Sequence, residues 1–108
     1  MASYPLPLPA SRALLKLGRD LALLRRRRKF SQASLAERSG IGLNTLKRLE
    51  KGEPRGSLEH LARILCVLSE VQRLEQLLDT RTDELGLMLM NEELPKRIRK
   101  KRQPKAAM

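Results

Sequence analysis

The sequence predicts an all-α fold, a small bundle of helices with flexible N- and C-terminal tails. Leucine is the most abundant of the 108 residues, whereas β-branched and aromatic residues are few, and this composition favours helices over sheet. The apolar residues recur at intervals of three and four, which places them on one side of a helix. Serine and glycine residues that can begin or end a helix separate these repeats.

Proline and charge divide the chain into four parts. Residues 1–10 contain three prolines that alternate with apolar residues, and they form either an extended, polyproline-like arm or a disordered leader. Residues 11–80 contain the helical repeats, and residues 81–94 form a short apolar segment suited to dimer or partner contact. Residues 95–108 form a basic tail. The net charge of +11 is unevenly distributed along the chain. The first half is basic, which suits contact with a polyanion, whereas the leucine-rich segment after it is acidic, which suits contact with another protein.

The first helix is expected to begin at Ser11, whose hydroxyl can cap it, and to end near Lys29. Leucines spaced three or four apart form one stripe along it. These leucines are Leu14, Leu17, Leu21 and Leu24. We expect this stripe to pack against the rest of the bundle.

Two short helices with a tight turn between them follow. Ser31 caps the first, which covers residues 32–38, and Gly40 supplies the left-handed turn. The second covers residues 43–51 and is closed by Gly52. This spacing is typical of a helix-turn-helix, in which the second helix enters the major groove of DNA. The residues expected to face inward are Leu35, Ala36, Ile41, Leu46 and Leu49.

The last helices have weaker signals. Ser57 caps a helix over residues 58–68, and capping-box spacing at residues 69–72 predicts another helix that ends near Leu78. Thr82 opens either a short turn or a helix, whereas the run LGLML that follows alternates in the manner of a strand.

Residues 17–78 resemble the Cro/repressor-type helix-turn-helix (XRE) family. The resemblance implies a lambda-repressor-like five-helix DNA-binding bundle, usually a two-fold dimer on a palindromic operator. Gly42 departs from the family pattern, which usually has Ser or Thr at this position. The likeness rests on LGRDLALLR (17–25), SQASLAERSGI (31–41), LNTLKRLEKGE (43–53) and SLEHLARILCVL (57–68).

The outer side of the second motif helix is expected to contact base edges, with a solvated helix face as the alternative. Asn44 can pair with adenine through two hydrogen bonds, and Lys47 or Arg48 can reach guanine O6 and N7. Leu43 can pack on a thymine methyl group. The DNA backbone contacts are expected from Gln32, Thr45, Lys51 and Arg55.

The resemblance adds roles for three of the residues. A glutamine at the position of Gln32 bonds a phosphate or the adjacent base in the resembling family, although a plain surface glutamine is the alternative here. The resemblance also implies an ion pair between Arg25 and Glu50, which would set the angle of the second motif helix. The alternative is that Arg25 is simply the first residue of the basic run 25–29. The rest of that run is expected to supply diffuse charge.

The chain has more apolar residues than one small bundle needs, which indicates a homodimer or partner surface. The segment DELGLMLMNEELPKRIRK resembles the tail of HipB-like antitoxins, which repress their own operon and bind a HipA-like kinase toxin. The segment lacks the terminal aromatic residue that some of these antitoxins use. The expected surface consists of Val71, Leu74, Leu78, Leu85 and Met88.

The remaining chemistry is sparse. His60 and Cys66 are the only histidine and cysteine, so we expect no metal, no cofactor and no enzyme activity. His60 is expected on the surface or in a first turn, and Cys66 in the core. The chain lacks a membrane-span pattern and the cationic flank of a signal peptide, so we expect a bacterial cytoplasmic protein that joins the nucleoid when bound to DNA.

Three alternatives to an antitoxin that represses its own operon stay open. The chain can be a stand-alone XRE-type regulator without a toxin, or a small basic RNA-binding protein. Two aromatic residues offer little stacking surface for single-stranded bases, which argues against RNA. A membrane-surface protein held by KRIRKKR would need an adjacent amphipathic anchor, which the sequence lacks.

Overall fold

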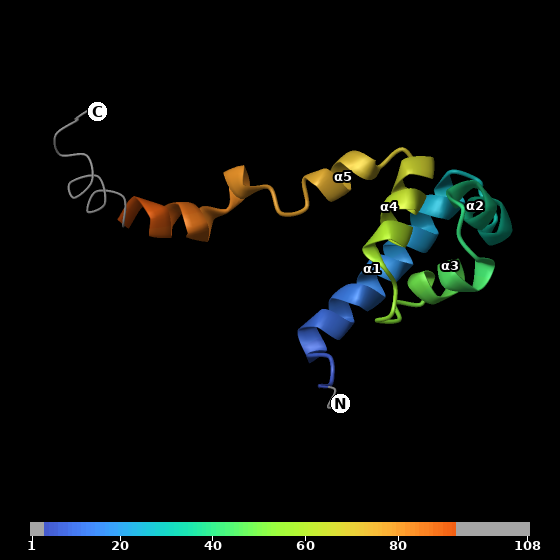
Figure 1. Cartoon of the computed structure of the whole chain (residues 1–108), viewed down its shortest axis with the longest axis horizontal. Helices are drawn as coiled ribbons and strands as arrows, with labels where there is room; N and C mark the ends of the chain where they lie inside the picture. The colour runs from blue at the N-terminus through green and yellow to red at the C-terminus, as the bar shows by residue number, and fades with distance from the viewer. Residues whose placement is uncertain (1–3, 93–108) are drawn as a thin grey trace. The chain divides into compact units, whose positions relative to one another are not determined.

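The computed structural model describes residues 4–92, and this part of the chain is helical without strands (Figure 1). Contacts divide the chain into two compact units, Met1–Leu74 and Glu75–Met108. The predicted all-α class is confirmed, while the basic tail expected at 95–108 lies outside the described residues. The elements are α1 (Leu8–Arg27), α2 (Gln32–Ser39), α3 (Leu43–Glu50), α4 (Leu58–Val67), α5 (Val71–Glu75), the 3-10 helix η1 (Thr80–Thr82) and helical residues 84–92.

Helix α1 begins earlier than predicted. Its N-cap residue is Pro7, and Ser11 lies inside the helix, where its N–H donates to the Pro7 carbonyl oxygen at 3.0 Å. Pro9 is tolerated in the first turn because its missing N–H would have no intrahelical acceptor there. Helix α1 therefore includes the last three residues of the arm expected at 1–10.

The caps of the middle helices are as predicted. The Ser31 hydroxyl accepts a hydrogen bond from the Ser34 N–H at 3.0 Å, and the Ser57 hydroxyl accepts one from the His60 N–H at 3.1 Å. Gly40 ends α2 with φ of 72°, a left-handed conformation that glycine adopts without a Cβ clash. These three positions determine where α2 ends and where α2 and α4 begin.

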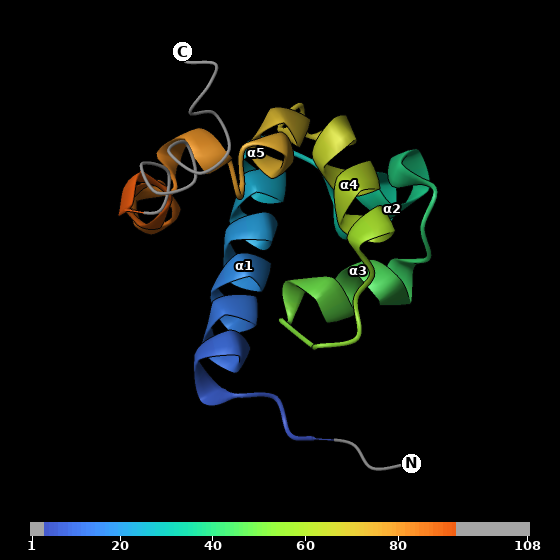
Figure 2. The ribbon, with the colours of Figure 1, turned by 60° about the vertical axis from the view of Figure 1, so that its left-hand side comes forward.

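The core of the first unit is formed by α1, α2, α3 and α4. Helix α2 packs against α3 and α4, and α1 packs against α3 (Figure 2). Ile41 and Leu49 are half-buried against this core, in agreement with the inward face expected for the helix-turn-helix. The buried core residues are Leu21, Leu35, Ala36, Leu46, Ile64 and Leu68.

Four further sequence predictions, on packing, capping and helix length, are wrong. Leu17 is 45% exposed. The buried residue at this point of α1 is its neighbour Gly18, which packs against the end of α3. Cys66 is exposed, since other residues of α4 face the core. Ser69 does not cap a helix: its φ is 61° and its N–H donates to the Cys66 carbonyl oxygen at 3.1 Å. The helix after it covers only Val71–Glu75 and does not reach residue 78.

Helices α1 and α3 approach each other closely at two glycines. A Cβ atom on Gly18 would lie 2.5 Å from the Glu50 carbonyl oxygen and 2.7 Å from the Leu49 carbonyl oxygen. A Cβ atom on Gly52 would lie 2.7 Å from the Leu15 Cα, and Gly52 also has φ of 77°. The crossing of α1 with the C-terminal end of α3 therefore depends on the absence of two side chains.

A buried ion pair connects the same region. Arg25 donates to Glu50 twice, from Nε to Oε2 at 2.7 Å and from Nη2 to Oε1 at 3.1 Å. Arg25 Nη1 donates to the Phe30 carbonyl oxygen at 3.0 Å, and Gln32 Nε2 donates to Glu50 Oε1 at 2.9 Å. The Arg25 and Glu50 side chains are only 10% and 6% exposed. This network joins α1 to the first residue of α2 and the last residue of α3.

The second unit is held by local contacts. The Asp79 carboxylate accepts the Arg81 N–H at 2.9 Å and pairs with the Arg81 guanidinium at 2.7 Å. The Arg81 side chain thereby lowers the pKa of the Asp79 carboxyl group. Thr82 lies within η1, and the helix after it is instead opened by Asp83, whose Oδ1 accepts the Gly86 N–H at 3.0 Å. The LGLML run is thus helical and not a strand.

Replacement of Gly18 by alanine is expected to lower the free energy of unfolding by about 1–3 kcal/mol, as at other overpacked sites. The clash with backbone atoms of α3 outweighs the gain of about 1 kcal/mol that alanine brings to a helix interior. Urea denaturation followed by circular dichroism measures the change.

Gly42→Ser is the matched control for Gly18→Ala. A Cβ atom on Gly42 meets only the Thr45 hydroxyl, at 3.7 Å, and φ is −71°. The added hydroxyl can cap α3, so the variant should be neutral or slightly more stable than the parent. A Gly18→Ala variant as stable as the parent would show that α1 and α3 have room for a side chain between them.

Loss of either partner of the Arg25–Glu50 pair is expected to lower the free energy of unfolding by about 3–5 kcal/mol, because the other partner stays buried without its counter-charge. Arg25→Met and Glu50→Leu remove the partners singly. The double variant should lose much less than the sum of the two single losses. Denaturation of the three variants forms a double-mutant cycle, in which additive losses would contradict a coupled pair.

Candidate nucleic-acid interface

Helix α3 buries one side and exposes the other. Leu46 has no exposed surface, Leu49 is half-buried, and the Glu50 side chain is only 6% exposed. Asn44 and Lys47 are exposed on the opposite side, together with Arg48, Lys51 and, at 38% exposure, Leu43. The four residues expected to contact bases are therefore accessible on one short helix.

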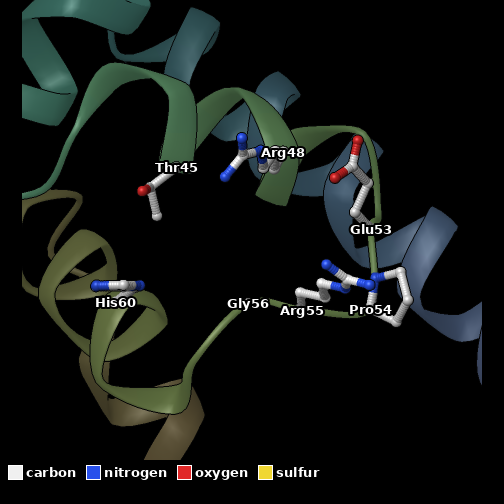
Figure 3. Close-up of a pocket in the computed structure, with 7 residues that line it drawn as sticks. All are labelled: Thr45, Arg48, Glu53, Pro54, Arg55, Gly56 and His60. Carbon is white, nitrogen blue, oxygen red and sulfur yellow. The ribbon is translucent and has the colours of Figure 1, made fainter.

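A hollow of about 600 Å³ lies along one flank of α3 (Figure 3). Thr45 and Arg48 of α3 lie on one side of it, and His60 of α4 lies opposite them. The loop after α3 completes the wall with Glu53, Pro54, Arg55 and Gly56. Two of the expected backbone-contact residues, Thr45 and Arg55, are therefore brought together here.

A second hollow, of about 510 Å³, lies on the other flank of α3, toward α1 and α2. Gln32 and Lys51, the other two expected backbone-contact residues, line it together with Lys47. Its remaining lining residues are Arg19, Ala22, Leu23, Arg26 and Glu50. The two hollows thus take residues from opposite flanks of the same helix.

The second hollow is strongly positive. Arg19 and Arg26 of α1 and Lys47 and Lys51 of α3 contribute four cations. Among the described residues, the only acidic one that lines it is Glu50, which is already bonded to Arg25 and Gln32. An anion approaching this flank therefore meets uncompensated positive charge.

Arg19 and Arg26 were missed as individual site residues in the sequence. Both lie on α1, which the motif pattern treats as a supporting helix, and Arg26 belongs to the run that we expected to supply diffuse charge. Their separation of seven residues places them on one side of α1. Only the packing of α1 against α3 shows that Arg19 and Arg26 line the same hollow as Lys47 and Lys51.

The residues expected to form a dimer or partner surface occur in both units. Val71 and Leu74 belong to the first unit and are half-buried. Leu78, Leu85 and Met88 belong to the second unit and are 86%, 64% and 55% exposed.

The described residues offer little for other chemistry. Between residues 4 and 92 there is no group of three or more side chains that could hold a metal ion. The same part of the chain has no helix with the length and apolar character that crossing a membrane requires. The accessible chemistry around α3 is that of cations, amides and hydroxyl groups, which suits binding to a polyanion.

Comparison with known proteins identifies the family. The sequence model of the helix-turn-helix domain matches residues 16–78, an interval that includes α2, α3 and α4 and is nearly that of the resemblance at residues 17–78. No curated protein and no solved structure gave a significant match. Because the matched interval covers more than half of the 108 residues, the chain belongs to the helix-turn-helix domain family and is a DNA-binding regulator.

Proposed function

We propose that the chain is a sequence-specific transcriptional repressor of the Cro/repressor (XRE) type, which inserts α3 into the major groove of double-stranded DNA. One observation carries this proposal: α3 exposes an amide and two cationic side chains, and a hollow with positive side chains lies on each of its flanks.

The dimensions of the groove support this arrangement. The major groove is about 12 Å wide, and an α-helix with its side chains is about 10–12 Å across, so a helix in the groove has one DNA strand on each side. The two hollows then face the two phosphate backbones. Cations placed there neutralise phosphates and release counterions.

Base discrimination is assigned to the exposed side of α3. Asn44 presents donor and acceptor groups that match adenine, and Arg48 or Lys47 present donors that match guanine. Leu43 is placed to contact a thymine methyl group. Because each of these side chains is exposed, none must leave a buried position to reach a base.

Backbone contact is assigned to Gln32, Thr45, Lys51 and Arg55, to which the structure adds Arg19 and Arg26 as candidates. Gln32 suits this role because its amide nitrogen has two N–H groups and uses one to bond Glu50. The other N–H has no acceptor within residues 4–92 and can donate to a phosphate in the second hollow. The bond to Glu50 holds the amide in position before DNA binds.

We further propose that the chain binds a palindromic operator as a homodimer. A single small domain has few contacts, and two half-sites one helical turn apart double them. The proposed dimer or partner surface consists of Val71, Leu74, Leu78, Leu85 and Met88. Its support is the apolar character of residues 84–92, where large hydrophobic side chains are exposed and would gain from being covered.

The finer role that we propose is that of an antitoxin which represses its own operon and binds a HipA-like kinase toxin. The support is the resemblance of residues 83–100 to the tail of HipB-like antitoxins, together with the exposed leucine and methionine side chains of that segment. Affinity purification from the native host tests it. Recovery of a kinase supports the antitoxin role, and its absence favours a stand-alone regulator.

Asn44→Ala and Arg48→Ala are each expected to cost about 1–3 kcal/mol of binding free energy at the operator and little on random DNA, because base contacts carry the discrimination. Fluorescence anisotropy with an operator selected from a random duplex library, and with a random duplex, measures both. Arg26→Ala is the matched control and should weaken binding to both duplexes and reduce the salt dependence. If both α3 variants keep the parent's operator preference, α3 is not the helix that reads the sequence.

The double substitution Leu85→Glu and Met88→Glu is expected to convert the dimer to a monomer and to weaken binding to the palindromic operator, because it places charge in an apolar interface. Light scattering measures the mass. Leu58→Glu is the control, since Leu58 is 75% exposed on α4, outside the proposed surface. A dimer that survives the double substitution would show that the subunits meet elsewhere.

A further inference from the structure

The hollow beside Thr45 and Arg48 is also lined by His60, the only histidine of the chain. None of the proposed DNA contacts involves His60. His60 lies in the first turn of α4, is half-buried and faces the hollow from the side opposite α3 (Figure 3). Its backbone N–H bonds the Ser57 hydroxyl, and its imidazole makes no hydrogen bond within residues 4–92. The imidazole is thus available to a ligand in the hollow.

The charged groups around His60 favour an anion. Arg48 of α3 and Arg55 of the loop face the same hollow, and the loop contributes one acidic residue, Glu53. Neither arginine belongs to an ion pair in the described part of the chain.

The other charged groups near α4 are turned elsewhere. On α4 itself, Glu59 and Arg63 pair with each other at 3.0 Å. Helix α2 also packs against α4, but its titratable residues, Glu37 and Arg38, do not line the hollow. The local field at His60 is therefore set by two arginines, one glutamate and whatever anion binds.

We propose that this hollow binds a backbone phosphate of duplex DNA and that protonated His60 supplies one of the contacts. This inference rests on the proposed DNA-binding function. A neutral imidazole has one N–H donor, whereas the protonated ring has two and carries a positive charge. A phosphate bound beside Arg55 adds the negative charge that favours the protonated ring, so DNA binding is coupled to proton uptake.

The consequence is that DNA affinity depends on pH in a range where the other DNA-contacting side chains keep their charge. Imidazole is the side chain that ordinarily changes charge between about pH 5 and pH 8, while arginine and lysine stay protonated. Affinity should therefore rise as the pH falls through this range. A phosphate contact is independent of sequence, so the effect should appear on any duplex.

The experiment measures the dissociation constant of the full chain for a random-sequence duplex of about two helical turns at about pH 8 and about pH 5.5. Fluorescence anisotropy at constant ionic strength gives the constants. The parent protein should bind roughly tenfold more tightly at the lower pH, the effect of one charge-assisted hydrogen bond. Calorimetry in two buffers of different ionisation enthalpy should show proton uptake on binding.

Three variants separate the possible causes. His60→Gln keeps a hydrogen-bonding side chain that does not titrate, and it should lose most of the pH dependence and of the proton uptake. His60→Arg should bind tightly at both pH values. Arg55→Gln should weaken binding at both while keeping the parent's ratio between them.

The outcomes also distinguish this inference from the proposed function. If the parent binds DNA and His60→Gln retains the parent's pH dependence, the inference is wrong and the proposed function stands. If the parent binds neither the random duplex nor any selected duplex at either pH, the proposed function itself is wrong, and the inference with it.

Discussion

The orientation of α3 depends on one buried carboxylate, that of Glu50. A negative charge at the C-terminal end of a helix is unfavourable, because the carbonyl groups there are themselves the negative end of the helix dipole. Arg25 compensates this charge with two hydrogen bonds and uses its third nitrogen to bond the Phe30 carbonyl oxygen, while Gln32 bonds the carboxylate from α2. One charged group thus joins three helices, and α3, which we propose presents Asn44 to DNA, is held at its far end.

The same region explains why we place α1 in the proposed DNA-binding surface and do not treat it as a supporting helix alone. Gly18 and Gly52 let the α1 backbone approach the end of α3 to a distance that a Cβ atom would prevent. This approach places Arg19 and Arg26 beside Lys47 and Lys51 in one hollow. The packing of α1 against α3 therefore both stabilises the bundle and brings these four cations together. A change that separates α1 from α3 would affect stability and DNA affinity together.

The two flanks of α3 differ in chemistry. Toward α1 and α2 the charge comes from arginine and lysine, whose positive charge does not vary across the physiological pH range. Toward the loop and α4 the hollow combines two arginines with a glutamate and a histidine. In the proposed complex the first flank provides constant attraction to phosphate and the second provides attraction that varies with pH. In this proposal both flanks contact the DNA backbone, so the exposed side of α3 alone is assigned the choice of sequence.

The sequence by itself determined the features that involve only a few neighbouring residues. Ser31, Ser57 and Gly40 were predicted correctly because a cap or a left-handed turn depends on groups within about four positions along the chain. Local patterns were wrong at two serines that were expected to cap helices. Ser11 lies within α1, and Ser69 follows the end of α4. Only the tertiary structure decided that Arg19 and Arg26 line a hollow with residues of α3 and that His60 lines the other hollow. These positions depend on how helices far apart in the sequence pack together. That packing is set by side-chain size and burial, which a local sequence pattern does not contain.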